Sequence, residues 1–196
     1  WIAKVNNIDS ISNIVIALSN MYRITFNKGR DFIRIGDMLE SLRCYLDIQK
    51  IRYDNLFEYK IEVDEHIEDY WVLNLIVQTV VENAIIHGLD GCERKGLIHI
   101  SASQIDDAIY FEVVDNGRGM GQEKLELITA MVNAENISSE SGLRNVQKRL
   151  KLKHGPEYGL EIESELDKGT KVTIKVPVIK ELEEEKMEFQ RGEQVD

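Results

Sequence analysis

The sequence predicts a mixed α/β domain that follows a helical hairpin. Up to residue 53, apolar residues recur every three or four positions, which is the spacing of one face of a helix. From Phe57 to Val63, apolar residues alternate with charged ones, which is the spacing of a half-buried strand. Strand-like and helical stretches then alternate up to Val176. The change of period after Asp54-Asn55 therefore marks the start of the α/β domain.

Composition limits the size and the partners of the chain. Its 196 residues, 43% of them hydrophobic, suffice for one domain with an appendage. The formal net charge of -11 argues against nucleic acid and membrane headgroups as partners, because surfaces that bind them are usually basic. Cys44 and Cys92 lack the CxxC spacing of a metal site, so we expect reduced thiols and a cytoplasmic location. No apolar run approaches the roughly 18 residues of a membrane span, and we expect no membrane contact by this chain.

The hairpin is predicted from two stripes of apolar residues, which are separated by residues typical of a turn. The first stripe has the spacing of a coiled-coil seam, and Asn27-Lys28-Gly29 then breaks the pattern. The stripes comprise Ile8, Ile11, Val15, Leu18 and Tyr22, and then Ile35, Met38, Leu39, Leu42, Tyr45 and Leu46. Because two helices alone bury little surface, we expect two hairpins to pair into a four-helix bundle in a homodimer. Packing of the hairpin on its own domain is the alternative.

The pattern divides the chain into residues 1–53 as the hairpin, 54–178 as the α/β domain and 179–196 as an acidic tail. The tail is expected to be disordered or a frayed helix. Within the domain we expect helices at about Tyr70–His87, Glu123–Met131 and Leu143–Lys153, and strands at Leu97–Ser103, Ile109–Val114, Leu160–Glu165 and Lys171–Val176. Asp106-Asp107 and Asp167-Lys168-Gly169 are expected to form the turns of two hairpins.

The end of the first of these helices carries candidate functional residues. Glu82 and Asn83 are polar residues in an otherwise apolar helix, and His87 lies four residues after Asn83 on the same face. Such groups need partners, because burying an unpaired carboxylate or amide is costly. A hydrated magnesium ion would suit the amide oxygen of Asn83, since Mg²⁺ prefers oxygen ligands and keeps several waters. A structural hydrogen bond at the helix end is the alternative.

A second group follows the strand that ends near Val114. Asp115-Asn116-Gly117 has the sequence of a hairpin turn, but the residues after Gly121 are helical, so no strand returns. A carboxylate fixed at a strand end can accept the amino proton of adenine. Gly117 and Gly119 would let the backbone approach a flat ring closely.

Two further glycine motifs are weaker when taken alone. Gly142 opens a helix, where exposed backbone N–H groups can hold a phosphate, although Ser141-Gly142 also suits ordinary capping. Gly169-Thr170 starts the last strand and most simply belongs to a turn.

Taken in order, the motifs resemble the successive boxes of the histidine-kinase/gyrase/Hsp90/MutL ATPase superfamily. They are Glu82-Asn83 with His87-Gly88, Asp115-x-Gly117-x-Gly119, Gly142-Leu143-Arg144-Asn145-Val146 and Gly169-Thr170. The segment Tyr45-Leu46-Asp47-Ile48-Gln49-Lys50-Ile51-Arg52-Tyr53 is similar to sensor kinases of the YesM/LytS type. The resemblance covers about residues 1–178. It implies the Bergerat ATP-binding fold, an α+β two-layer sandwich with helices on one face of a mixed sheet, preceded by the hairpin.

The resemblance also implies roles for the matching residues. Asn83 would bind Mg²⁺ and Glu82 would act as base or polariser in phosphoryl transfer, with His87 as a second catalytic candidate. Asp115 would hold the adenine amino group, with Thr170 nearby through water.

The remaining motifs would surround the base and the phosphates. Gly117 and Gly119 would line the base, while Gly142 and Leu143 would close a lid of roughly residues 121–141. From charge and position we infer that Arg144 and Arg149 neutralise phosphate charge, with a solvated helix face as the alternative.

The implied activity is that of a two-component sensor histidine kinase with ATP and Mg²⁺ as cofactors. Such an enzyme transfers the γ-phosphoryl group to a histidine and then to an aspartate of a response-regulator protein. The family's His-Phe-Leu-Tyr-Asn phosphoacceptor motif surrounds none of the four histidines. We therefore expect that this chain cannot autophosphorylate. We expect the chain to belong to a longer protein, which segments upstream of residue 1 anchor in the bacterial plasma membrane.

Two other functions fit parts of the pattern. Relatives often carry extra glycines just before the residue matching Gly142, where this chain has Ser138-Ser139-Glu140-Ser141, and Glu140 would repel phosphates. A degenerate, nucleotide-free dimerisation or docking module is therefore one alternative. An anti-sigma-type serine kinase is the other, because its ATP domain is similar, although such a protein is not expected to begin with this hairpin.

Overall fold

The computed structural model describes residues 31–89, 92, 94–134 and 142–182. The first hairpin stripe, the break at residues 27–29, the glycine-poor segment with Glu140 and most of the acidic tail lie outside these residues. The described chain forms two compact units. The smaller unit contains residues 31–56, 68–74 and 179–182, and the larger contains 57–67 and the described residues of 75–178.

The smaller unit is built on one helix and a two-stranded sheet. Strand β1 (Phe32–Arg34) leads directly into helix α3 (Ile35–Arg52) and pairs antiparallel with β3 (Trp71–Leu73). Arg34 reinforces this pairing, because its guanidinium lies 3.1 Å from the Asp69 carboxylate and over the Trp71 ring. Helix α3 confirms the second predicted helix, and all six residues of its predicted stripe are buried.

The end of α3 confirms the predicted change at Asp54-Asn55. The cap residue Tyr53 donates its N–H to the Gln49 carbonyl, and Asp54 and Asn55 then adopt positive φ values of 48° and 58°. Asp and Asn tolerate this left-handed region better than most residues, so the helix ends here. Strand β1 was not predicted, because three residues are too few to show a period.

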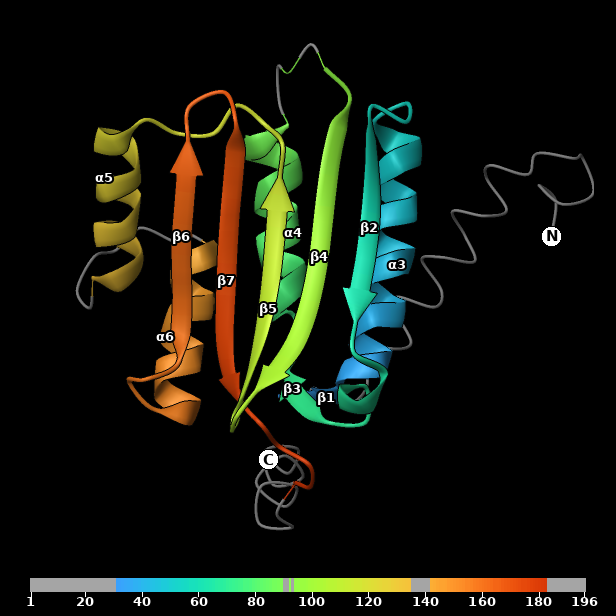
Figure 1. Ribbon diagram of the computed structural model, residues 1–196, viewed down its shortest axis with the longest axis vertical. Helices are drawn as coiled ribbons and strands as arrows, with labels where there is room; N and C mark the ends of the chain where they lie inside the picture. The colour runs from blue at the N-terminus through green and yellow to red at the C-terminus, as the bar shows by residue number, and fades with distance from the viewer. Residues whose placement is uncertain (1–30, 90–91, 93, 135–141, 183–196) are drawn as a thin grey trace, which may run out of the picture. The chain divides into compact units, whose positions relative to one another are not determined.

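The larger unit contains a mixed five-stranded sheet in the order β2-β4-β5-β7-β6 (Figure 1). The strands are β2 (Phe57–Val63), β4 (Gly96–Ile105), β5 (Ala108–Asp115), β6 (Gly159–Glu165) and β7 (Gly169–Pro177), and a short 3-10 helix, η1 (Glu65–Ile67), follows β2. Strand β2 runs parallel to β4 and the other neighbouring pairs are antiparallel. All five predicted strands are therefore present, with Asp106 and Asp167 at positive φ in the two predicted turns.

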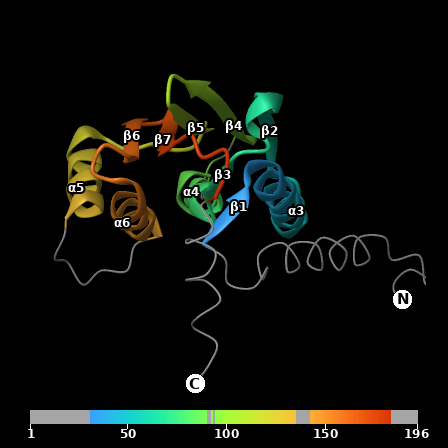
Figure 2. The ribbon, with the colours of Figure 1, turned by 90° about the horizontal axis from the view of Figure 1, so that it is seen from below.

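Helices cover one face of this sheet. They are α4 (Ile76–Asn83) with its π-helical continuation η2 (Ala84–Gly88), and α6 (Gly142–His154), and a further helix, α5 (Gln122–Asn133), lies at the edge of the sheet (Figure 1). Figures 1 and 2 show α4 and α6 behind the same face, with α5 beyond the edge strand β6. Alternate residues of β5 are fully buried, among them Ile109, Phe111 and Val113. The predicted two-layer arrangement is confirmed.

One predicted helix begins in the wrong place. The helix expected from Tyr70 starts only at Ile76, because residues 71–73 form β3 and Leu75 has a φ of 68°. A left-handed residue cannot continue a right-handed helix. The residues from Trp71 to Val77 could not reveal this, since all but Asn74 are apolar and so short an apolar segment has no clear helical or strand period.

Candidate functional site

Asp115 is a buried carboxylate at the end of a central strand. It is the last residue of β5, which lies between β4 and β7, and only 5% of it is exposed. Its Oδ1 atom accepts the backbone N–H of Gly117 at 2.8 Å. Burial raises the pKa of the Asp115 carboxyl, while the backbone N–H groups of Gly117 and Thr170 partly oppose this by stabilising the ionised form.

Glycines surround Asp115 at distances that exclude side chains. A Cβ atom on Gly117 would lie 2.0 Å from the Gly88 carbonyl oxygen, and one on Gly169 would lie 1.9 Å from the carbonyl oxygen of Asp115 itself. Gly119 has a φ of 58°, and its Cβ would meet the Glu165 backbone. Three loops can therefore meet at the end of β5 only because these positions lack side chains.

A cavity of about 300 Å³ lies beside the Asp115 carboxylate. Its apolar lining is Val80, Ala84, Val113, Met120, Ile128, Met131, Val132, Leu143, Ile162 and Val172, and its other lining residues are Asn83, His87, Gly88, Asp115, Arg118, Gly119, Lys124 and Thr170. The volume is at the lower end of the range for small-molecule sites, about 300–1,000 Å³. A mainly apolar cavity with one buried acceptor suits a flat ring that carries a hydrogen-bond donor.

The end of α4 supplies the polar wall of this cavity. Asn83 lines it and donates its Nδ2 to the Thr79 carbonyl at 2.7 Å, an orientation that leaves the amide oxygen as the group able to meet a cation. His87 also lines the cavity, as the shared face with Asn83 predicted. Glu82 is half-buried outside the lining, and the Gln78 amide donates to one of its carboxylate oxygens at 3.0 Å.

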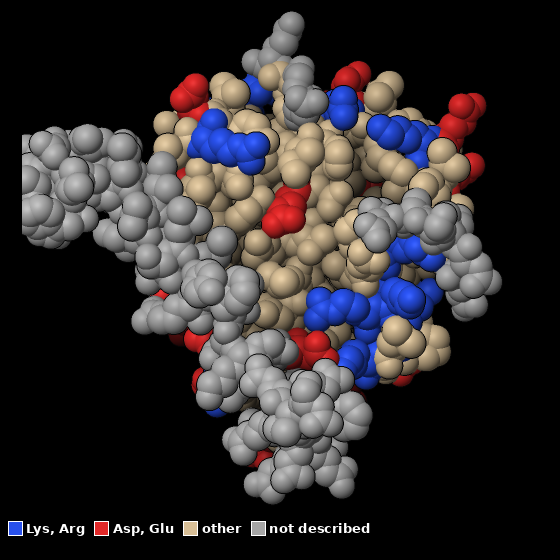
Figure 3. Space-filling model, turned by 180° about the vertical axis from the view of Figure 1, so that it is seen from behind, with Lys and Arg blue, Asp and Glu red and all other residues tan. Residues whose placement is uncertain are grey.

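Helix α6 begins next to Asn83. A Cβ atom on Gly142 would lie 2.9 Å from the Thr79 methyl group and 3.6 Å from Asn83 Nδ2. The first N–H groups of a helix attract anions, and α6 itself contains five Lys and Arg residues and no acidic one. Figure 3 shows these Lys and Arg side chains gathered on the helix-covered side of the molecule.

The structure brings most of the predicted site residues to one cavity. Asn83, His87, Asp115, Gly119, Leu143 and Thr170 line it, whereas Glu82, Gly117, Gly142 and Arg144 do not. Gly117 nevertheless donates its N–H to Asp115, and Gly142 lies so near the Thr79–Asn83 turn that a Cβ atom there would meet the Thr79 methyl group. Arg144 instead donates to the Ala134 carbonyl at 3.1 Å, and Arg149 is also absent from the lining.

Sequence reasoning placed residues 121–141 in a lid but named none of the α5 residues that line the cavity, and it missed Arg118. Lys124, Ile128 and Met131 line the cavity from one face of α5, and Arg118 and Lys124 provide its basic groups. The three- and four-residue spacing on α5 was a usable signal, since it marks one side of a helix. Nothing in the sequence showed that this side meets the cavity.

In the part of the chain that the structure describes, no three or more His, Cys, Asp or Glu side chains come together in a way that could hold a metal ion. None of the described helices is both long and apolar enough to span a membrane.

Comparison with known proteins identifies the family. Residues 68–180, more than half of the chain, match the model of the histidine kinase-, DNA gyrase B- and HSP90-like ATPases. The chain belongs to this ATPase family. Residues 1–57 also match the model of the histidine kinase family, so the resemblance seen in the sequence motifs is confirmed.

Curated relatives of this ATPase family member are sensor kinases. The sensor histidine kinase YesM of Bacillus subtilis is 30% identical over 90% of this chain, and the sensor protein LytS of Bacillus cereus is 28% identical over 87%. The chain spans only 29% of the length of each of these relatives.

Solved structures confirm the fold of this ATPase family member. The histidine kinase domain of a blue-light-activated kinase from Erythrobacter litoralis matches with a TM-score of 0.53 and 21% identity, covering 86% of this chain and 75% of that one. The catalytic domain of the histidine kinase ThkA matches with a TM-score of 0.54 and 18% identity, covering 74% and 94%. A structure of ThkA in complex with the response regulator protein TrrA also matches, with a TM-score of 0.53 and 19% identity over 74% and 41%.

Proposed function

We propose that this chain binds ATP with Mg²⁺ in the cavity beside Asp115 and forms the ATP-binding catalytic portion of a two-component sensor histidine kinase. The observation that carries the proposal is the 5% exposed carboxylate of Asp115 at the edge of a mainly apolar cavity. The adenine ring is flat and its amino group is a donor, so the ring would fill the apolar space while Asp115 accepts that proton. The surrounding glycines would let the ring approach the backbone.

The phosphates would lie at the other end of the cavity, between Asn83 and the start of α6. The Asn83 amide oxygen would hold Mg²⁺, which needs few protein ligands because it retains waters and binds phosphate oxygens. The absence of a larger cluster of acidic or imidazole ligands among the described residues is compatible with such a site. Arg118 and Lys124, together with the N–H groups at the start of α6, would offset the phosphate charge.

Phosphoryl transfer depends chiefly on positioning and on charge neutralisation. In the proposed reaction Glu82 polarises or deprotonates the attacking histidine, and the Gln78 amide orients its carboxylate. His87 is the second catalytic candidate, because it lines the cavity one turn from Asn83. The histidine acceptor would belong to the longer protein, and an aspartate of a response-regulator protein would receive the phosphoryl group next.

The proposed partners are a response-regulator protein and a second copy of the chain. The names of the relatives and the complex of ThkA with TrrA support the first partner. The match of residues 1–57 to the histidine kinase family supports the second, since the predicted coiled-coil seam falls in that region.

Calorimetric titration with ATP, ADP and GTP tests the proposal. Guanine presents a carbonyl where adenine has its amino group, so the buried carboxylate should disfavour GTP by roughly 100-fold. Asp115→Asn should weaken ATP binding and remove most of this preference, because its amide is a weaker acceptor for adenine than a carboxylate and can donate to guanine. Saturable ATP binding that depends on Asp115 supports the proposal. No binding by the folded wild-type protein would favour a docking module without nucleotide.

A further inference from the structure

Arg94 joins three backbone carbonyls from two loops. Its Nε donates to the Asn116 carbonyl at 2.9 Å, and its Nη2 donates to the carbonyls of Gly117 at 2.9 Å and Asp167 at 2.7 Å. Nη2 also contacts the Asn116 carbonyl. Arg94 lies 22 residues from Asn116 and 73 from Asp167 in sequence, so it connects distant parts of the chain.

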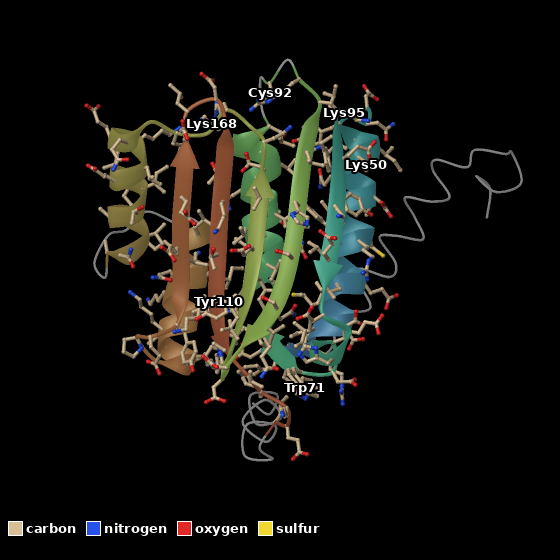
Figure 4. All side chains as sticks on the ribbon, viewed as in Figure 1. Lys50, Trp71, Cys92, Lys95, Tyr110 and Lys168 are labelled. Carbon is tan, nitrogen blue, oxygen red and sulfur yellow. The ribbon has the colours of Figure 1, made fainter. Side chains whose placement is uncertain are left out.

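These loops lie at one end of the sheet. Figure 4 shows Cys92 and Lys95, which flank the Arg94 segment, at the same end as Lys168 in the β6–β7 turn. The Asp167 N–H donates to the Arg118 carbonyl at 2.7 Å, which ties the turn to the glycine loop a second time. Asn116 is also bonded to strand β4, because its Oδ1 accepts the Leu97 N–H at 2.7 Å.

Two of the three carbonyls that Arg94 binds belong to Asn116 and Gly117, the residues that follow Asp115. Gly117 accepts from Arg94 through its carbonyl and donates its N–H to Asp115 Oδ1 at 2.8 Å. On the other side of the loop, the Gly88 carbonyl would lie only 2.0 Å from a Gly117 Cβ. The loop is therefore fixed between Gly88 and Arg94, and this fixes the hydrogen bond that orients the carboxylate.

We propose that Arg94 is a positioning residue that holds residues 115–119 in the shape that recognises adenine. Arg94 is absent from the cavity lining, so it acts through the loop and does not touch the nucleotide. Only a guanidinium has enough donors in one plane to bind three carbonyls at once, and a lysine ammonium could replace part of this set. The inference rests on the proposed function for the role of the loop, although the bonds themselves do not depend on a ligand.

The first test compares adenosine, ADP and ATP binding to the wild-type chain, Arg94→Met, Arg94→Lys and the neighbouring control Lys95→Ala. Loss of the charged hydrogen bonds should lower the affinity for all three ligands by about the same factor, which should be roughly tenfold for Arg94→Met and smaller for Arg94→Lys. Lys95→Ala should leave affinity unchanged, because Lys95 pairs with Glu58 on the surface.

The pattern across the ligands decides between explanations. A much larger loss for ATP than for adenosine would overturn the inference, because Arg94 would then act on the phosphates. Unchanged affinities with a lower melting temperature would also overturn it, since Arg94 would then only stabilise the fold.

A second measurement needs no nucleotide and separates this inference from the proposed function. Amide hydrogen exchange at Gly117 should be at least tenfold faster in Arg94→Met than in the wild-type chain, with exchange in the middle of β4 unchanged. Equal exchange at Gly117 in both proteins would overturn the positioning role even if ATP binds. Faster exchange in a chain that binds no adenosine would instead refute the proposed function and confine Arg94 to ordering the loop.

Discussion

A Cβ atom added to Gly88 would lie 2.8 Å from Oδ1 of Asp115 and 2.9 Å from its Cγ. Asp115 cannot move aside freely, because it is buried and bonded to Gly117. We predict that Gly88→Ala displaces the carboxylate, lowers ADP affinity at least tenfold and reduces the free energy of unfolding by about 1–3 kcal/mol. Calorimetry and urea unfolding measure the two effects.

Gly121→Ala is the matched control for this substitution. A Cβ on Gly121 would meet nothing within 4 Å, and its φ of -71° suits alanine. It should leave both affinity and stability nearly unchanged. Wild-type ADP affinity in Gly88→Ala would show that the carboxylate position is not critical.

Asp115 should reduce stability at neutral pH. Burial raises the pKa of its carboxyl in the folded protein, so the folded state binds the proton more tightly than the unfolded chain does. The contribution of Asp115 to the free energy of unfolding therefore falls as the pH rises from the ordinary aspartate pKa through the raised pKa of the folded protein. Above the raised pKa, the whole loss of stability remains. Asp115→Asn should remove this decline, so that the variant is at least as stable as wild type at pH 7 but binds ATP weakly.

Urea unfolding of both proteins between pH 4 and pH 8 measures the difference. The stability of wild type minus that of Asp115→Asn should decrease with rising pH. An increase over that range would mean that the hydrogen bonds from Gly117 and Thr170 outweigh burial.

Asn83→Ala should remove the effect of magnesium on ATP binding. We expect Mg²⁺ to strengthen ATP binding to the wild-type chain and to have little effect on the variant, while adenosine binding changes less than about threefold because Asp115 is untouched. Gln104→Ala is the control, since the Gln104 amide donates to the Asp106 carbonyl in the β4–β5 turn and Gln104 is absent from the cavity lining. Equal magnesium enhancement in Asn83→Ala would contradict the assignment of the metal ligand.

Leu75 occupies a backbone conformation that suits few side chains. With a φ of 68°, it precedes α4 without a side-chain capping bond. We predict that Leu75→Asn is more stable than Leu75→Ala by about 1 kcal/mol, because Asn tolerates the left-handed region. If Leu75 lay inside a helix, Leu75→Ala would be the more stable of the two variants, since Ala is the better helix former. Thermal unfolding of the two variants distinguishes these cases.

Much of the fold was predictable because its elements carry their own period. The five strands and the helices α5 and α6 were placed within a few residues, and Asp167 and Gly169 marked a real turn. The error at residues 70–75 arose where a short apolar run pairs with β1, a partner that lies far away in sequence. Division of the chain into domains at residues 53 and 178 stays a prediction, although the compact units also change near these positions.

The candidate site was predictable where it consists of unusual residues in regular elements. Asp115 and Asn83 stood out because they are polar at the ends of apolar segments, and both line the cavity. Arg144 was proposed to neutralise phosphate from its charge and its position near the start of a helix, but its guanidinium donates to the Ala134 carbonyl instead. Nothing in the sequence indicated the role of Arg94, because its partners are backbone carbonyls, which every residue has.

The place of β7 in the sheet has a consequence for biosynthesis. This strand follows β6 in the chain but lies between β6 and β5, and Thr170 and Val172 on it line the cavity. A ribosome releases Asn83 and Asp115 well before Gly169 emerges. While β7 is still inside the ribosome, the nascent chain lacks one wall of the cavity and the strand that covers Asp115. The domain should therefore gain the ability to hold nucleotide in one late step of its synthesis, when its last strand enters the sheet.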